Sequence, residues 1–189
     1  MDIIAVIFNM VISVATLLLF FRFMMQLCAV DRYNPVVMST VRVTHVADVF
    51  ARILPTLATG RIHLAALVLI VLLRLLELSG NSMLGEVAVS GPAELLVMTI
   101  ISLLQSFLKF CYWLIFGSII LGWVTAFTQA QSPYIDLVRQ LAEPLYAPFR
   151  KMLPDLGPID LSPMIAFLII IVSQKILDYA AVTILSMLS

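Results

Sequence analysis

Six ionisable side chains interrupt the long apolar stretches of this chain of 189 residues. An ionisable group deep in a membrane span costs about 2.5 to 3.5 kcal/mol on insertion scales, so it needs a partner or a wet cavity. Such groups belong to structural ion pairs or to pathways for ions. The six are Arg22, Arg74, Glu77, Lys109, Lys175 and Asp178.

Two interpretations are open for the pairs Arg74/Glu77 and Lys175/Asp178, whose members are three residues apart on one helical face. Each pair can neutralise itself within its helix or snorkel to the surface, or the two pairs can face one another across the bundle and line a polar path. Arg22 lies near the end of its span, where snorkelling to headgroups explains it. Lys109 has no acid within four residues, so it needs one from another helix or an interfacial depth.

Other chemistry is sparse along the chain. His45 and His63 lack the spacing and the companions of a zinc site, and no Walker loop, nucleophile elbow or dinucleotide fingerprint occurs. We therefore expect a protein that is not an enzyme, with no catalytic residues, cofactor or metal ion. The basic pair Arg150-Lys151 could attract anionic lipid, but nearby acids dilute its field, and we interpret it mainly as a topology signal.

Composition indicates the elements that carry these residues. The chain is 62% hydrophobic and only 12% charged, with a formal net charge of zero, which disfavours a water-soluble globule and a nucleic-acid binder. A helix crosses the bilayer with about 20 apolar residues. The sequence predicts an all-α membrane protein with four transmembrane helices, at 3–30, 62–78, 94–128 and 163–188.

Lysine and arginine are distributed unevenly between the connections. They occur in the segments 31–61 and 129–163 and are missing from 79–93, and basic residues near span ends stay on the cytoplasmic side. We expect both long connections to be cytoplasmic, 81–93 to be an outward-facing loop, and both termini to lie outside.

An offset of roughly a hundred residues aligns the two halves of the chain, 1–80 and 94–189, as a tandem repeat. Asn34-Pro35 then falls on Ser132-Pro133, and Pro55 falls near Pro154. Each half reads as helix, interfacial amphipathic helix and helix, with an N-cap and a proline opening the interfacial helix. We place these helices at 35–54 and 133–153, and expect Pro144 and Pro148 to bend or break the second one.

The motifs DRYNP (31–35) and SPYIDLVRQLAEPLYAPFRKMLPDLGPIDLSPM (132–164) resemble those of the YggT family, also called YlmG-like. These are small bacterial and plastid membrane proteins with one or two copies of the repeat, and the two-copy form matches nearly the whole chain. The first copy departs from the pattern, since it lacks counterparts of Pro144 and Pro148. The pattern picks out Asn34, Pro35, Arg42, Pro55, Ser132, Pro133, Pro144, Pro148, Arg150, Lys151, Pro154, Gly157, Asp160 and Pro163.

The resemblance implies physiological roles and no established reaction: osmotic or envelope stress in bacteria, and division, nucleoid organisation or cytochrome assembly in relatives. We expect a non-enzymatic inner-membrane protein of envelope or osmotic-stress homeostasis. It would act through its membrane-surface helices, the lipid bilayer and an unidentified membrane protein partner or further copies of itself. The alternatives are an oligomeric channel or transporter for ions or osmolytes, and an assembly factor for another membrane complex.

Overall fold

The computed structural model describes residues 3–30, 33–45, 48, 56–57, 62–87, 91–129, 131–153 and 160–188. Within these ranges the regular elements are helices, apart from two strands of two residues, β1 (Thr56–Leu57) and β2 (Ile62–His63), which pair antiparallel. The helices are α1 (Ile3–Leu27), α2 (Pro35–Val43), α4 (Leu64–Met83), α5 (Pro92–Thr128), α6 (Pro133–Arg150) and α7 (Ser162–Leu188).

Four of these helices, α1, α4, α5 and α7, are long and apolar enough to cross a membrane. This confirms the predicted all-α architecture with four spans interleaved with shorter helices. The second span runs five residues beyond its predicted end, to Met83. Two residues later, Gly85 adopts φ +74. That left-handed conformation ends a helix and favours glycine. The predicted outward loop is shorter by the same amount.

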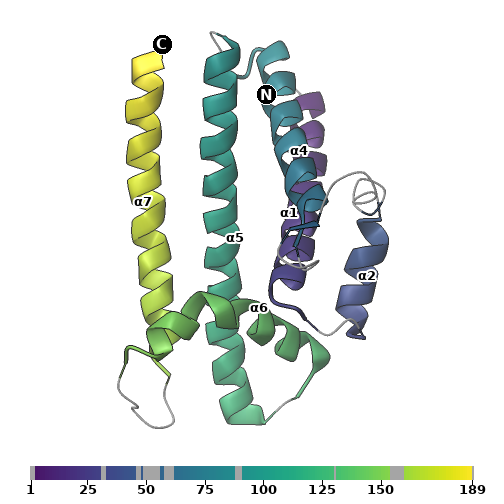
Figure 1. Cartoon of the computed structure of the whole chain (residues 1–189), viewed down its shortest axis with the longest axis vertical. Helices are drawn as coiled ribbons and strands as arrows, with labels where there is room; N and C mark the ends of the chain where they lie inside the picture. The colour runs from purple at the N-terminus through teal and green to yellow at the C-terminus, as the bar shows by residue number, and fades with distance from the viewer. Residues whose placement is uncertain are drawn as a thin grey trace.

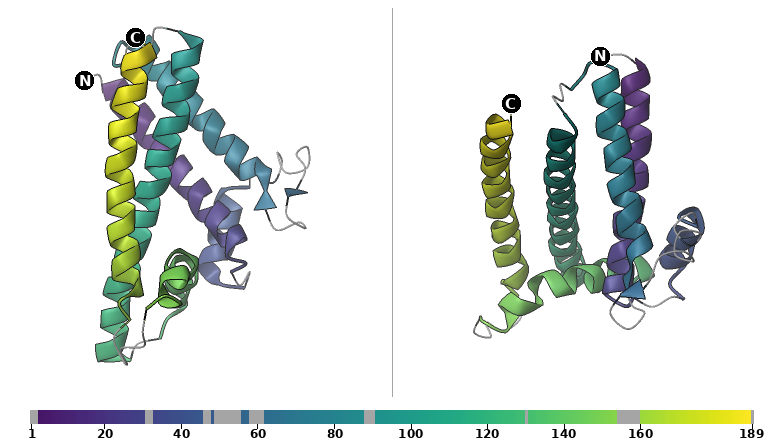
Figure 2. Two further views of the ribbon diagram at one scale, coloured as in Figure 1. Left: turned by 60° about the vertical axis from the view of Figure 1, so that its left-hand side comes forward. Right: turned by 45° about the horizontal axis from the view of Figure 1, so that its top comes forward.

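The spans are arranged as a row and not as a closed ring (Figures 1 and 2). α5 packs against α7 on one side and α4 on the other, while α1 packs mainly on α4. The interpretation in which the two charged pairs of α4 and α7 face one another is therefore wrong, because α5 stands between them. α5 has 37 residues, a length of about 55 Å against a hydrocarbon core of about 30 Å.

The shorter helices α2 and α6 lie toward one end of the bundle, and both chain ends lie at the other (Figure 1). α6 is anchored by its apolar face, since Leu141 is fully buried in a core cluster with Met24 of α1 and Ile115 of α5. Aromatic contacts between Phe20 of α1 and Phe110 of α5 extend this cluster. The first and second halves of the chain therefore share one core around α6.

The two shorter helices depart from their predicted bounds. α2 ends at Val43, where the prediction ran to Leu54, and Thr44 closes the helix through a hydrogen bond from its amide to the Thr40 carbonyl. α6 ends at Arg150 and contains both internal prolines in one continuous helix, so the prolines bend it without breaking it (Figure 1). Packing of the apolar face on the core compensates for the hydrogen bonds that proline removes.

Candidate functional site at the shorter helices

The two shorter helices, α2 and α6, are joined at their starts. The Asn34 Oδ1 atom accepts a hydrogen bond from the Val36 amide at 2.9 Å, while its Nδ2 atom donates to the Pro133 carbonyl at 2.9 Å. One side chain thus caps α2 and ties it to the start of α6. Ser132 caps α6 through its hydroxyl, which accepts from the Tyr134 amide at 3.4 Å. The predicted caps are confirmed, and the structure brings the two Xaa-Pro motifs together.

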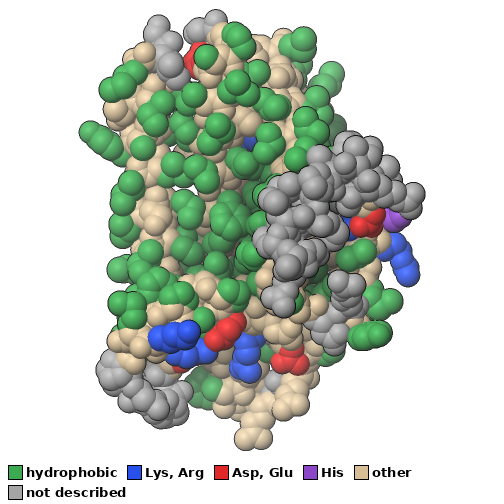
Figure 3. Space-filling model, in the orientation of Figure 1, with side chains coloured by type: hydrophobic (Ala, Val, Ile, Leu, Met, Phe, Trp, Pro, Cys, Tyr) green, Lys and Arg blue, Asp and Glu red, His purple; other side chains and the backbone are tan. Residues whose placement is uncertain are grey.

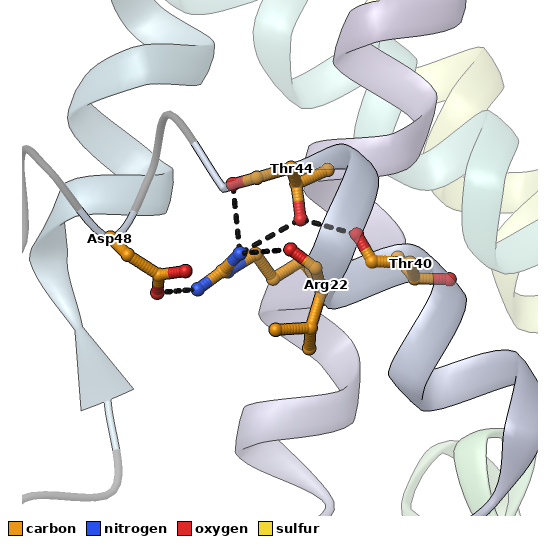
Figure 4. A network of polar contacts seen from close by, with 5 residues as sticks. Arg22, Thr40, Thr44 and Asp48 are labelled. Carbon is orange, nitrogen blue, oxygen red and sulfur yellow. Dashed lines mark hydrogen bonds and ion pairs between the residues drawn. The ribbon is translucent and has the colours of Figure 1, made fainter.

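Arg22 of α1 holds the other end of α2 (Figure 4). Its Nη1 atom donates to the Thr44 carbonyl and the Thr44 hydroxyl, both at 2.8 Å, and to the Val41 carbonyl at 3.3 Å. Its Nη2 atom forms an ion pair with Asp48. The Thr44 hydroxyl can accept from Arg22 because it donates its own proton to Thr40.

The expectation that Arg22 snorkels to headgroups is wrong, because its side chain is only 6% exposed. The last carbonyls of a helix have no partner within that helix and carry partial negative charge, so a guanidinium with several donors is favoured there. Sequence reasoning missed Thr44 and Asp48. One signal was available, since Asp48 is the only acid in the predicted segment 35–54.

A second charged cluster joins the end of α6 to the start of α7. Arg150 forms ion pairs with Glu143 and with Asp160, the latter at 2.6 Å from Nη2. The guanidinium carbon also lies 5.0 Å from the centre of the Tyr146 ring. Asp160 accepts a hydrogen bond from the Ser162 amide at 2.9 Å, which confirms that it caps the fourth span.

The ionisation of this cluster follows from its contacts. Burial raises the pKa of Asp160, but hydrogen bonds from Ser162 and Arg150 outweigh it, and the pKa lies below its ordinary value. The hydrogen bond to Asp160 raises the pKa of Arg150 further. Burial, followed by the neighbouring Glu143 carboxylate, raises the pKa of Tyr146 to about 12. At neutral pH the Asp160 carboxylate and the Arg150 guanidinium are therefore charged, and the Tyr146 phenol is neutral.

A groove of about 820 Å³ opens beside this cluster, between α5, α6 and the first turn of α7. Its walls are mostly apolar and its polar groups come from α6 and from Asp160. It is lined by Ser118, Ile119, Leu121, Gly122, Trp123, Ala126, Phe127, Ile135, Val138, Arg139, Glu143, Tyr146, Arg150, Asp160, Pro163 and Met164.

The charged pairs inside the spans behave differently from one another. Arg74 pairs with Glu77 at 2.6 Å in its own helix, as predicted, and also donates to the Ser102 hydroxyl of α5 at 2.9 Å. Asp178 instead accepts from the Gln105 side chain of α5 at 2.9 Å. Within the described ranges no ion pair joins Asp178 to Lys175, so self-neutralisation within the helix is wrong for α7, and snorkelling of the exposed Lys175 to the surface stays a prediction.

Lys109 and Lys175 are exposed and form neither a hydrogen bond nor an ion pair in the described part of the chain. Ser102 and Gln105, which the sequence reasoning did not single out, lie three apart on α5 and reach the charged residues of α4 and α7 respectively. Across the described residues, no three His, Cys, Asp or Glu side chains gather to hold a metal ion.

The remaining motif residues have varied surroundings. Arg42 and Lys151 are exposed at the ends of α2 and α6. Pro35 and Pro133 open those helices, whereas Pro163 lies in the first turn of α7 and lines the groove. Pro144 and Pro148 are exposed within α6. Three motif residues lie outside the described residues: Pro55, Pro154 and Gly157.

Comparison with known proteins agrees with the resemblance seen in the motifs. A sequence model of the CCB3/YggT family matches residues 97–181. An uncharacterised protein of Pseudomonas aeruginosa is 38% identical over 82% of this chain and 78% of its own length. The protein YggT of Escherichia coli K12 is 32% identical over 86% of this chain and 82% of its own length.

A protein of Haemophilus influenzae is 31% identical over 89% of this chain and 88% of its own length. No solved structure matches the chain. The names of these relatives state no activity, so the comparisons give a family and an architecture but no reaction. With its four apolar spans and bacterial relatives that it matches over most of their length, the chain is a multi-pass membrane protein of the YggT family.

Proposed function

We propose that this protein is a non-enzymatic component of the bacterial inner membrane that supports envelope or osmotic-stress homeostasis. Its working part is a platform made of α2 and α6, lying on the cytoplasmic leaflet and receiving protein partners. The observation that carries the proposal is the hydrogen bond from Asn34 to the Pro133 carbonyl, which joins the starts of two helices from opposite halves of the chain.

Two features support a platform held in a defined position. The apolar face of α6 is buried, with Leu141 fully buried, whereas α2 buries Val37, which is 6% exposed, and leaves Met38 and Val43 exposed. The opposite face of α6 is polar and exposed, as at Asp136 and Gln140. A helix with one face in the core and one face free presents the same side chains to a partner at all times.

The distribution of bases supports the cytoplasmic assignment, because Lys and Arg outside the spans occur only in the two connections that include α2 and α6. Fusions of a reporter at residue 140 and at the C-terminus should report opposite compartments. Reporters that place both positions in the same compartment contradict the assignment.

The alternatives draw less support from the geometry. A channel lined by both charged pairs is disfavoured because α5 separates α4 from α7. Reconstituted liposomes should accordingly show no potassium flux, with either the wild type or a Glu77→Gln, Asp178→Asn variant. An assembly factor would use the same platform and would differ only in the identity of its partner.

The test uses a bacterium from which the native relative is deleted and replaced by variants of this chain. Leu141→Asp places a carboxylate in the core and undocks α6, whereas Gln140→Asp places it on the exposed face of the same turn. We expect Leu141→Asp to abolish survival after an osmotic downshift and Gln140→Asp to preserve it. Val37→Asp and Met38→Asp form the matched pair in α2, where Met38 is 53% exposed.

Immunoblots of the membrane fraction show whether each variant is inserted at the wild-type level. Inserted but undocked variants that protect as well as the wild type contradict the platform. A deletion strain with no osmotic phenotype contradicts the proposed physiological role.

A further inference from the structure

The groove between α5, α6 and α7 has the size and lining of a ligand site. Its volume of about 820 Å³ falls within the range of about 300 to 1,000 Å³ found for small-molecule pockets. The α5 wall is largely apolar and outward-facing, with Trp123 64% and Phe127 88% exposed. A side chain added at Gly122 would meet nothing within 4 Å, so the space in front of this wall is open.

Charges of both signs line the α6 side of the groove. Arg150 is shared between the carboxylates of Glu143 and Asp160, so these three groups carry a formal charge of −1. Arg139 lies one helical turn before Glu143, is exposed, and forms no hydrogen bond or ion pair within the described ranges. The lining therefore presents one free cation beside a net negative cluster, and its total charge is zero.

We propose that the groove binds one phosphatidylethanolamine molecule, a zwitterionic phospholipid with a primary ammonium group. Its phosphate contacts the free guanidinium of Arg139, and its ammonium contacts the carboxylates of Glu143 and Asp160. Its acyl chains begin at the apolar wall of α5 and run past Met164 of α7 toward the middle of the spans. This site is independent of the proposed role in osmotic homeostasis.

Charge complementarity selects this headgroup over the other common types. A guanidinium binds a phosphate through two parallel hydrogen bonds, and an ammonium supplies three donors to carboxylate oxygens. Phosphatidylcholine has no N–H group to donate. Phosphatidylglycerol has no cation to place against the two carboxylates and adds negative charge beside them.

The surroundings match the boundary between headgroups and acyl chains. Charged side chains form a band over α6, and the surface above this band is largely hydrophobic (Figure 3). Trp123 and Tyr146 both line the groove, and their rings combine an apolar body with a polar tip. Such aromatic residues are enriched at the level of the headgroups in membrane proteins.

The test uses the fluorescence of Trp123 in phosphatidylcholine vesicles. The chain has two tryptophans, so Trp113→Phe leaves Trp123 as the single indole. Lipids with brominated acyl chains quench an indole that they contact, and they are added as ethanolamine, choline or glycerol headgroups at equal fractions. We expect the ethanolamine lipid to quench at mole fractions about five- to tenfold lower than those of the other two lipids. One charge-assisted hydrogen bond that stays partly hydrated strengthens binding by about this factor.

Variants separate the contributions of headgroup and chain. Glu143→Gln should lower quenching by the ethanolamine lipid to the level of the choline lipid. Arg139→Gln should weaken both lipids alike, because both carry the phosphate. Gly122→Leu should fill the groove and abolish the preference, whereas Gly117→Leu, which also meets nothing within 4 Å and lies outside the groove, should leave it intact.

Equal quenching by all three headgroups would mean that only bulk lipid touches Trp123, and it overturns the proposal. Stronger quenching by the glycerol lipid would reveal an anionic-lipid site and overturns it as well. A preference for ethanolamine that survives both Glu143→Gln and Gly122→Leu would place the lipid elsewhere on the protein.

Discussion

Each of the shorter helices α2 and α6 is attached to a span by an arginine, but the two arginines lie in opposite environments. Arg22, which holds the end of α2, is 6% exposed, whereas Arg150, which joins α6 to α7, is 48% exposed. Arg22 bonds chiefly to the backbone and hydroxyl of Thr44, while Arg150 bonds to side-chain carboxylates. The first attachment is part of the interior, and the second lies in the wall of an open groove.

The exposure of each arginine determines how much its contacts contribute to stability. Removing one partner of a buried charge costs about 3 to 5 kcal/mol because the other polar groups stay unpaired. An exposed ion pair contributes about 0 to 1 kcal/mol. The Arg22 contact therefore determines where α2 lies, whereas α6 is positioned by its apolar face and its charges remain available to a ligand.

The largest effect is expected from Arg22→Ala. The last carbonyls of α2 and the Thr44 hydroxyl would lose a buried donor. The free energy required to open α2 should therefore fall by about 3 kcal/mol. Hydrogen exchange of the amides in residues 37–44 should accelerate by about a hundredfold. Arg42→Ala, an exposed change in the same helix, is the control, and equal exchange in both variants would contradict the comparison.

The next effect concerns pH and the packing of α6. Because the pKa of Tyr146 is raised to about 12 from an ordinary 10, the folded state favours the neutral phenol. The stability that this group contributes is complete below pH 10 and is lost as pH rises toward 12. We expect a loss of about 1 to 2 kcal/mol in unfolding experiments, and Tyr146→Phe should remove this part of the alkaline loss. A loss of stability at alkaline pH that Tyr146→Phe leaves unchanged would contradict this role of Tyr146.

A third test compares helix contacts in the two halves. A side-chain carbon added at Gly80 of α4 would lie 2.7 Å from the ring of Phe8 in α1. Gly80→Ala should therefore destabilise the protein by about 1 kcal/mol in detergent, and Phe8→Leu should relieve the loss. Gly117→Ala in α5 meets open space and should be neutral or slightly stabilising. The reverse order of the two alanine variants would contradict the contrast between the tight contact at Gly80 and the open space at Gly117.

The smallest effect is expected at the exposed cluster. Arg150→Gln should cost less than about 1 kcal/mol. The contribution of Asp160, whose pKa is lowered, is complete above its ordinary pKa of 3.8 and disappears as pH falls through the lower folded value. Acid titration of the unfolding free energy should show this decline, and Asp160→Asn should flatten it. A loss at Arg150 as large as that at Arg22 would remove the distinction between the two attachments.

The features that could be predicted from sequence depend on neighbours within a few residues. The four spans follow from apolar length, and the caps at Asn34, Ser132 and Asp160 bond to amides two positions away. Arg74 and Glu77 also met as predicted because their spacing places them on one helical face. The compartment of α2 and α6 remains a prediction.

The features that could not be predicted depend on residues far apart in the chain. The expectation that Arg22 snorkels to headgroups is wrong because its partner carbonyls lie about twenty residues away in the chain, on α2 and at its end. Hydropathy cannot show that those carbonyls turn toward the interior. The same limit applies to Asp178, which bonds to Gln105 of α5 in place of Lys175. The motif residue Arg150 was recognised, but its partners were not.

Local chemistry thus determined that this chain crosses the membrane four times and where its shorter helices begin, since apolar length and capping act within one or two turns. Which charges are paired, which are buried and where a groove remains open were decided by the way α5 and α6 pack against helices of both halves. That packing depends on contacts between distant side chains, and no short stretch of sequence contains them.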